Sequence, residues 1–175
     1  MTSAAHASPA PEGALPPGIA RVLKYFGALG RDEKMQALVG YARKLEPLPE
    51  RLAALDRAEF TVPECQTRVD IFAELKDGRL HYYADLNARQ SPTIAAVLAI
   101  VFSAVNDQEP AATLGIPADF VRRLMEGIGL AARESGLMAM VQRLKRSAAQ
   151  AQRLLEAGAG TGPEPVLVHA PTTAG

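Results

Sequence analysis

The only cysteine of the chain, Cys65, lies in the polar segment 62–68, which reads VPECQTR. A single cysteine in a soluble domain is most often a small buried hydrophobe. Here the flanking residues are polar, and Pro63 favours an extended backbone at Val62, so we predict a loop between two stiff elements. Because loops held by a rigid scaffold often carry function, Cys65 is the first candidate for chemistry, as a reactive thiol.

The remaining composition excludes several other kinds of site. With one cysteine, no disulfide can form within the chain, and a Cys-rich zinc or iron–sulfur site is excluded. Of the three histidines, His6 and His169 lie in tails that we expect to be disordered, so His81 stands alone and no metal site is predicted. The 19 basic and 19 acidic side chains balance, which predicts binding neither to nucleic acid nor to an anionic membrane surface.

The chain shows no pattern of a secretory signal, which would be a basic region followed by an apolar run. Its longest apolar run, residues 93–105, is shorter than the roughly 20 residues needed to span a bilayer. We therefore expect a soluble protein in the reducing cytoplasm, where a lone thiol stays reduced.

The elements that position Cys65 follow from composition and periodicity. Residues 1–16 and 157–175 are rich in Ala and Pro, and we predict that both are disordered tails, since the apolar run 166–168 is too short to change this. One folded domain remains, over residues 17–156.

Three helices are predicted ahead of Cys65, over residues 19–29, 32–45 and 50–55. The apolar spacing of the second helix predicts one buried face, formed by Met35, Leu38, Val39 and Ala42.

After Cys65 the apolar side chains recur at every second residue, as in a β-strand, and no longer at helical spacing. Residues 69–75 alternate between apolar and polar side chains, as a half-buried strand does. Asp77-Gly78 is typical of a tight hairpin turn, and residues 79–84 return as a second strand. Residues 59–62 are a candidate third strand.

Helices resume after the hairpin. Residues 93–105 are apolar all round and are predicted to form the central buried helix. Further helices are predicted over residues 117–125 and 134–156. The fold class is therefore α+β, with a small antiparallel β-sheet packed against helices.

The cysteine segment, PECQTRV at residues 63–69, is accompanied by five further motifs, at residues 41–49, 77–80, 84–85, 91–94 and 133–140. In their order and spacing these segments resemble the SufE family, whose members accept sulfur from cysteine desulfurases. The cysteine segment is similar to the family's Gly-Cys-Gln-Ser motif, which a Val-aromatic strand follows. Together the likeness covers about residues 20–148, so the chain is identified as SufE-like.

The resemblance implies a function as a sulfur carrier. A pyridoxal-phosphate cysteine desulfurase of the SufS or CsdA type would pass a persulfide to Cys65, and an iron–sulfur cluster scaffold would receive the sulfur next. The carrier would stimulate the desulfurase without being a stand-alone enzyme. It would hold no cofactor, because pyridoxal phosphate belongs to the partner.

The resemblance also implies roles for four side chains besides Cys65. A free cysteine is only a few per cent thiolate at pH 7, and a nearby cation would raise that fraction. Arg133 matches the family's signature arginine and is the candidate cation, with Arg68 as the second. Gln66 would orient the loop or contact the partner, and Asp85 would brace the loop beneath the thiol.

Four positions depart from the family's pattern. Glu64 stands in place of Gly, Thr67 in place of Ser, Asp70 in place of an aromatic residue, and Glu134 in place of Ser. These changes leave the carrier cysteine intact and bear on which partner is recognised.

Two other classes of function stay open. A cysteine hydrolase would need a histidine beside Cys65, and the folded part offers only His81, without glycines around the nucleophile. A non-catalytic helical adaptor would carry Cys65 as an incidental packing residue.

Overall fold

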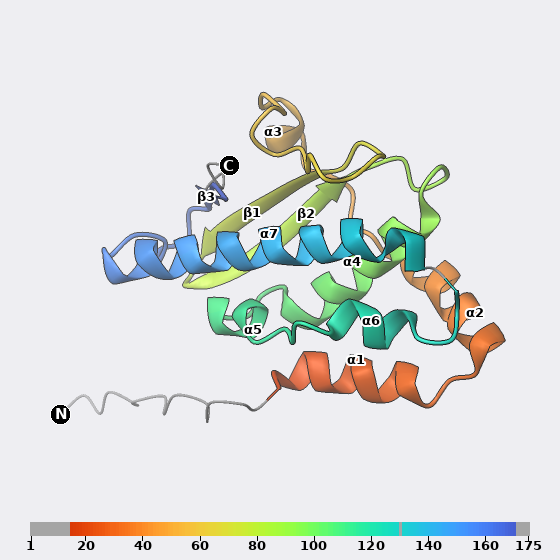
Figure 1. Cartoon of the computed structure of the whole chain (residues 1–175). Helices are drawn as coiled ribbons and strands as arrows, with labels where there is room; N and C mark the ends of the chain where they lie inside the picture. Colours follow the sequence, from red (N-terminus) through yellow and green to blue (C-terminus); the bar gives the residue numbers. More distant parts are fainter. Residues whose placement is uncertain (1–14, 130, 171–175) are drawn as a thin grey trace.

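The computed structural model of the chain describes residues 15–129 and 131–170 (Figure 1). The elements in chain order are α1 (Pro17–Gly27), α2 (Arg31–Ala42), α3 (Glu50–Ala53), β1 (Asp70–Lys76), β2 (Arg79–Asp85), α4 (Pro92–Val105), α5 (Pro110–Leu114), α6 (Phe120–Met125), α7 (Ala131–Glu156) and β3 (Val166–Val168). The prediction of an α+β fold with a small antiparallel sheet is confirmed.

The sheet has the strand order β2-β1-β3, and both pairs are antiparallel. The hairpin between β1 and β2 turns at Asp77 and Gly78, whose φ angles are 51° and 75°. Positive φ at both central residues is what a two-residue turn needs to match the twist of its strands, and this explains the Asp-Gly pair. The register places Asp70 opposite Asp85, so both carboxylates lie at one end of the hairpin.

The expectation of a disordered tail does not hold for residues 157–170. Val168 pairs with Ala73 of β1, and the Asp77 and Gly78 amides donate to the Gly162 and Gly160 carbonyls, each at 2.9 Å. The free edge of β1 supplies the partner groups that this short apolar run cannot supply for itself. Residues 1–14 and 171–175 of the two expected tails lie outside the described residues.

The predicted third strand at residues 59–62 is replaced by a single bridge between Thr61 and Asp70. This segment nevertheless covers the outer face of β1, where Phe60 stacks on Phe72 with 4.5 Å between ring centroids. Leu52 of α3 joins them in a small apolar cluster. The strand predicted to be half-buried is therefore buried on both faces, because this segment covers one face and α7 packs on the other.

The inner face of the sheet packs on helices. α4 contacts β2, and α7 contacts β1 and β3, while α1, α2, α5 and α6 pack against these two helices (Figure 1). The prediction that residues 93–105 form the central buried helix is confirmed by α4, of which eleven residues are buried. Each buried Leu, Ile or Val contributes about 1.5–3 kcal/mol before entropy is subtracted.

The predicted buried face of α2 is wrong in part. Leu38 is buried, whereas Met35 and Val39 are 43% and 54% exposed. Lys34 takes a buried position instead, because its Nζ reaches across to donate to the Glu126 carbonyl at 2.8 Å. The long aliphatic stem of a lysine can line a core while its charged end finds a polar partner.

Candidate functional site

Cys65 lies at the crown of a loop that is closed at its base. The Val62 amide donates to the Val69 carbonyl at 2.9 Å, and the Ile71 amide donates to the Phe60 carbonyl at the same distance. Val62 and Val69 are 1% and 0% exposed, so the two ends of the loop are anchored in the core. Between these anchors Glu64, Gln66 and Arg68 are exposed, whereas Cys65 is half-buried and packs against the core.

Cys65 lines a hollow of about 350 Å³, which we call the thiol pocket. The Cys65 loop forms one wall, and the first turns of α7 form another. Among the described residues, the lining is Glu64, Cys65, Gln66, Thr67, Ile94, Arg133, Ser135, Gly136, Leu137 and Met140. Since Ile94, Leu137 and Met140 are buried, the pocket has an apolar floor beneath a polar rim.

Of the five predicted site residues, the structure brings three together. Gln66 and Arg133 line the thiol pocket with Cys65, and both side chains are exposed. Asp85 is not part of this lining. Its carboxylate instead accepts a hydrogen bond from Arg57 at 2.7 Å. Arg68, the second candidate cation, is 69% exposed and lies 3.5 Å from the Asp70 carboxylate.

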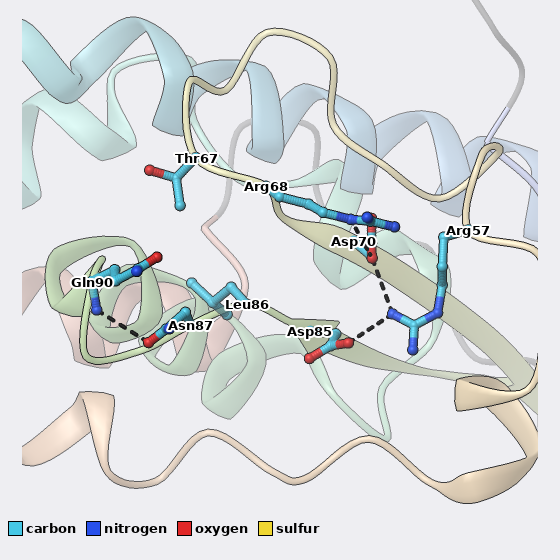
Figure 2. A pocket seen from close by; sticks show the side chains of 8 residues that line it. All are labelled: Arg57, Thr67, Arg68, Asp70, Asp85, Leu86, Asn87 and Gln90. Atoms are coloured by element: carbon cyan, nitrogen blue, oxygen red, sulfur yellow. Dashed lines mark hydrogen bonds and ion pairs between the residues drawn. The ribbon is translucent and has the colours of Figure 1, made fainter.

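Arg57 and Asp70 form an ion-pair network at the base of the loop (Figure 2). Arg57 Nη1 donates to Asp70 at 3.0 Å as well as to Asp85, and the Thr61 hydroxyl donates to Asp70 at 2.5 Å. The hydrogen bond to Asp85 outweighs burial and, with that to Asp70, raises the pKa of Arg57 above its ordinary value. The network ties the chain before the loop to both strands after it, so Asp85 supports the loop through Arg57.

Arg143 of α7 lines neither the thiol pocket nor its rim, but it supports the Cys65 loop from below, a role that the sequence analysis missed. It is 9% exposed and donates to the Glu59 carbonyl, which joins α7 to the segment that leads into the loop. Burial lowers the pKa of Arg143, and the charge of Arg146 adds to this, whereas the carboxylates of Glu64 and Asp70 oppose it. Its position beside Met140 and Leu144, inside the apolar stripe of α7, is the signal that could have identified it.

Ser91 is a second missed residue. It is 1% exposed, and its hydroxyl donates to the Thr67 hydroxyl at 3.1 Å. Ser91 directly precedes α4, so this bond fixes the Cys65 loop to the start of the central helix.

His81 lies elsewhere on the domain. Its Nδ1 lies 2.9 Å from the Asp107 carboxylate and its Nε2 lies 2.7 Å from the Glu46 carboxylate. It does not line the thiol pocket, so the structure offers no support for a cysteine hydrolase that uses His81 as its base. Burial alone would lower the pKa of His81, but the hydrogen bonds to Asp107 and Glu46 outweigh it and raise the pKa above its ordinary value.

The raised pKa of His81 predicts how the stability of the protein changes with pH. A group whose pKa is higher in the folded chain contributes stability that is complete below the ordinary histidine pKa of about 6.5 and is lost as the pH rises through the folded value. We expect His81→Gln to destabilise the protein most near about pH 6 and least near about pH 9. Urea unfolding of both proteins across this range, with His169→Gln as the comparison, measures the difference. Parallel profiles for wild type and His81→Gln would contradict the prediction.

Among the described residues, no group of three or more His, Cys, Asp or Glu side chains is arranged to hold a metal ion. Within residues 15–129 and 131–170, no helix is long and apolar enough to cross a membrane.

Fold and site together define a class, an α+β domain that presents one thiol on an anchored loop between its sheet and its longest helix. The SufE family model, described as an Fe-S metabolism associated domain, matches residues 20–148. The chain belongs to the SufE family and thereby to iron–sulfur metabolism.

Individual relatives agree with this assignment. Uncharacterised SufE-like proteins from two strains of Mycobacterium tuberculosis are 33% identical over 140 residues, which cover 75% of this chain and 92% of each relative. An uncharacterised SufE-like protein of Synechocystis is 28% identical over 110 residues, or 61% of this chain and 64% of the relative. The solution structure of a hypothetical protein from Thermus thermophilus matches with a TM-score of 0.67 and 27% identity, over 82% of this chain and 99% of that chain.

Proposed function

We propose that this protein accepts one sulfur atom as a persulfide on Cys65 from a pyridoxal-phosphate cysteine desulfurase of the SufS or CsdA type. It stimulates that desulfurase and passes the sulfur to a scaffold for iron–sulfur cluster assembly in the cytoplasm. The observation that carries this proposal is the thiol pocket, in which the half-buried Cys65 and the exposed Arg133 line one hollow. The protein acts as a carrier and activator, and the cofactor belongs to its partner.

The transfer is a thiol exchange that needs no external oxidant or reductant. The Cys65 thiolate attacks the outer sulfur of the partner's protonated persulfide, and a bond forms between Cys65 Sγ and that sulfur. The S–S bond of the partner breaks, and its electron pair leaves with the partner's cysteine as a thiolate. The proton stays on the transferred sulfur, so atoms and charge balance.

The lining of the thiol pocket suits this exchange. The positive charge of Arg133 would attract the thiolate, and the exposed Gln66 would contact the partner or orient the loop. Ile94, Leu137 and Met140 form the apolar floor, which keeps water from one side of a persulfide and so limits side reactions. Asp85 acts on the loop only through its ion pair with Arg57.

The decisive experiment is the intact mass of the protein after incubation with an active desulfurase and free cysteine. We expect a gain of about 32 Da, one sulfur atom, that a reductant removes. Peptide mapping places the added mass on Cys65. No gain in mass from a desulfurase that is turning over would refute the proposed function.

Arg133→Ala is expected to slow sulfur uptake about three- to tenfold, because a cation that attracts the reacting thiolate is lost; this corresponds to about 0.7–1.4 kcal/mol of barrier. Arg133 is exposed, so the fold should be unchanged. Arg153→Ala is the matched control, since Arg153 is an exposed arginine near the far end of α7. Uptake rates are measured from the mass gain with time. If both variants take up sulfur at the rate of wild type, Arg133 has no part in the exchange.

A further inference from the structure

A second and larger hollow, of about 530 Å³, lies beside the Cys65 loop. We call it the polar hollow. Its lining is Arg57, Thr67, Arg68, Asp70, Asp85, Leu86, Asn87 and Gln90 (Figure 2). Thr67 also lines the thiol pocket, so one residue of the loop separates the two hollows. A partner that approaches Cys65 from the side of Thr67 therefore lies over the polar hollow.

One end of the polar hollow is electrically balanced. Two arginines and two carboxylates line it, and Arg57 is engaged by both Asp70 and Asp85 while Arg68 lies against Asp70. Because these charges are already paired with one another, a phosphate or another strongly charged ligand would have to displace an existing ion pair. The lining instead favours a ligand that is neutral overall.

The other end presents groups that form hydrogen bonds (Figure 2). Asn87 Oδ1 accepts from the backbone amides of Arg89 and Gln90, at 3.1 and 3.2 Å, which leaves the Asn87 Nδ2 group as a donor for a ligand. Gln90 is exposed, and within the described residues its carboxamide makes no hydrogen bond. Such a carboxamide offers both a donor and an acceptor, as each peptide unit of a polypeptide does.

The wall between the two hollows is fixed in place. The Ser91 hydroxyl holds Thr67 at 3.1 Å, and Ser91 is itself buried at the start of α4. Since the base of the loop is also closed, the distance between the polar hollow and Cys65 is set before any ligand arrives. Prior organisation of this kind lowers the entropy lost on binding.

We propose that the polar hollow binds the main chain of the desulfurase next to its persulfide-bearing cysteine. The proposal rests on the proposed function, in which the sulfur arrives on a protein and not on a small molecule. A sulfur that enters the thiol pocket by way of Thr67 brings its flanking chain over the polar hollow, where the carboxamides of Asn87 and Gln90 can meet the peptide groups. A volume of about 530 Å³ lies within the range of ordinary ligand sites.

The test is Gln90→Trp, which fills the polar hollow from an exposed turn position without removing a described hydrogen bond of the Gln90 side chain. Arg89→Trp is the matched control, because Arg89 is exposed in the same turn but does not line the hollow. For Gln90→Trp we expect the concentration that half-saturates desulfurase stimulation to rise about tenfold or more, with the maximal stimulation preserved. Arg89→Trp should behave as wild type.

A second measurement separates docking from chemistry. Cysteine persulfide, a small donor, needs no polypeptide groove, so its rate of sulfur transfer to Cys65 should be equal in Gln90→Trp and wild type. Equal half-saturation of the desulfurase by Gln90→Trp and wild type would overturn the docking role, as would a slower reaction of the variant with cysteine persulfide. A wild-type protein that takes no sulfur from the desulfurase would instead remove the proposed function itself.

Discussion

Cys65→Ser is expected to take up no sulfur and to leave the desulfurase at its unstimulated rate. Cys65 is the only cysteine in the chain, so no other thiol can form the S–S bond that transfer requires. A serine hydroxyl is similar in size but does not form a stable persulfide analogue. Because Cys65 is half-buried at the crown of a loop, the substitution should leave the fold unchanged.

Two measurements check this expectation. Sulfide release by the desulfurase reports stimulation, and the intact mass reports uptake. Ser135→Ala is the matched control, since Ser135 is an exposed hydroxyl residue of the same thiol pocket and carries no exchangeable sulfur. Full stimulation by Cys65→Ser would show that the protein activates the desulfurase by contact alone, and would refute the carrier function.

The loop around Cys65 could be predicted from the sequence because its causes are local. Pro63 and the polar residues after it interrupt the apolar pattern, and the alternation that starts at Val69 marks the return to a strand. The Asp77-Gly78 turn and the all-apolar run of α4 were equally local signals, and the structure confirms both. The pairing of Cys65 with Arg133 in one pocket came from the resemblance to the SufE family, because no periodicity relates residues so far apart in the chain.

The features that the sequence did not predict depend on partners far along the chain. Val166–Val168 forms β3 only because β1 offers it a free edge. Arg143 is buried in spite of its charge because the Glu59 carbonyl lies opposite, and nothing near Arg143 in the sequence indicates that partner. Asp85 was expected to brace the loop beneath the thiol, but the register that places it beside Asp70 and Arg57, at the base of the loop, becomes known only with the fold.

Asp70 is where this chain departs from the family's pattern and where the base of the loop depends on a charge. The family's usual residue here is aromatic, whereas Asp70 binds Arg57 and Thr61 and lies near Arg68. Its carboxylate is 3% exposed, so a buried ion pair stands directly after the loop's buried anchor Val69. A buried charge of this kind stabilises the chain only while its partners remain in place.

Asp70→Ala is therefore expected to lower the free energy of unfolding by about 3 kcal/mol, because it removes the buried member of an ion pair, which accepts hydrogen bonds from both Arg57 and Thr61. Asp85→Ala is the matched control, since Asp85 contacts the same Arg57 nitrogen but is 47% exposed. Because solvent screens this exposed pair, Asp85→Ala should lower the free energy of unfolding by about 1 kcal/mol or less. Urea unfolding at neutral pH measures both values. Equal losses for the two variants would show that burial does not set the strength of this network, and that Asp70 holds the base of the Cys65 loop no more firmly than an ordinary surface pair would.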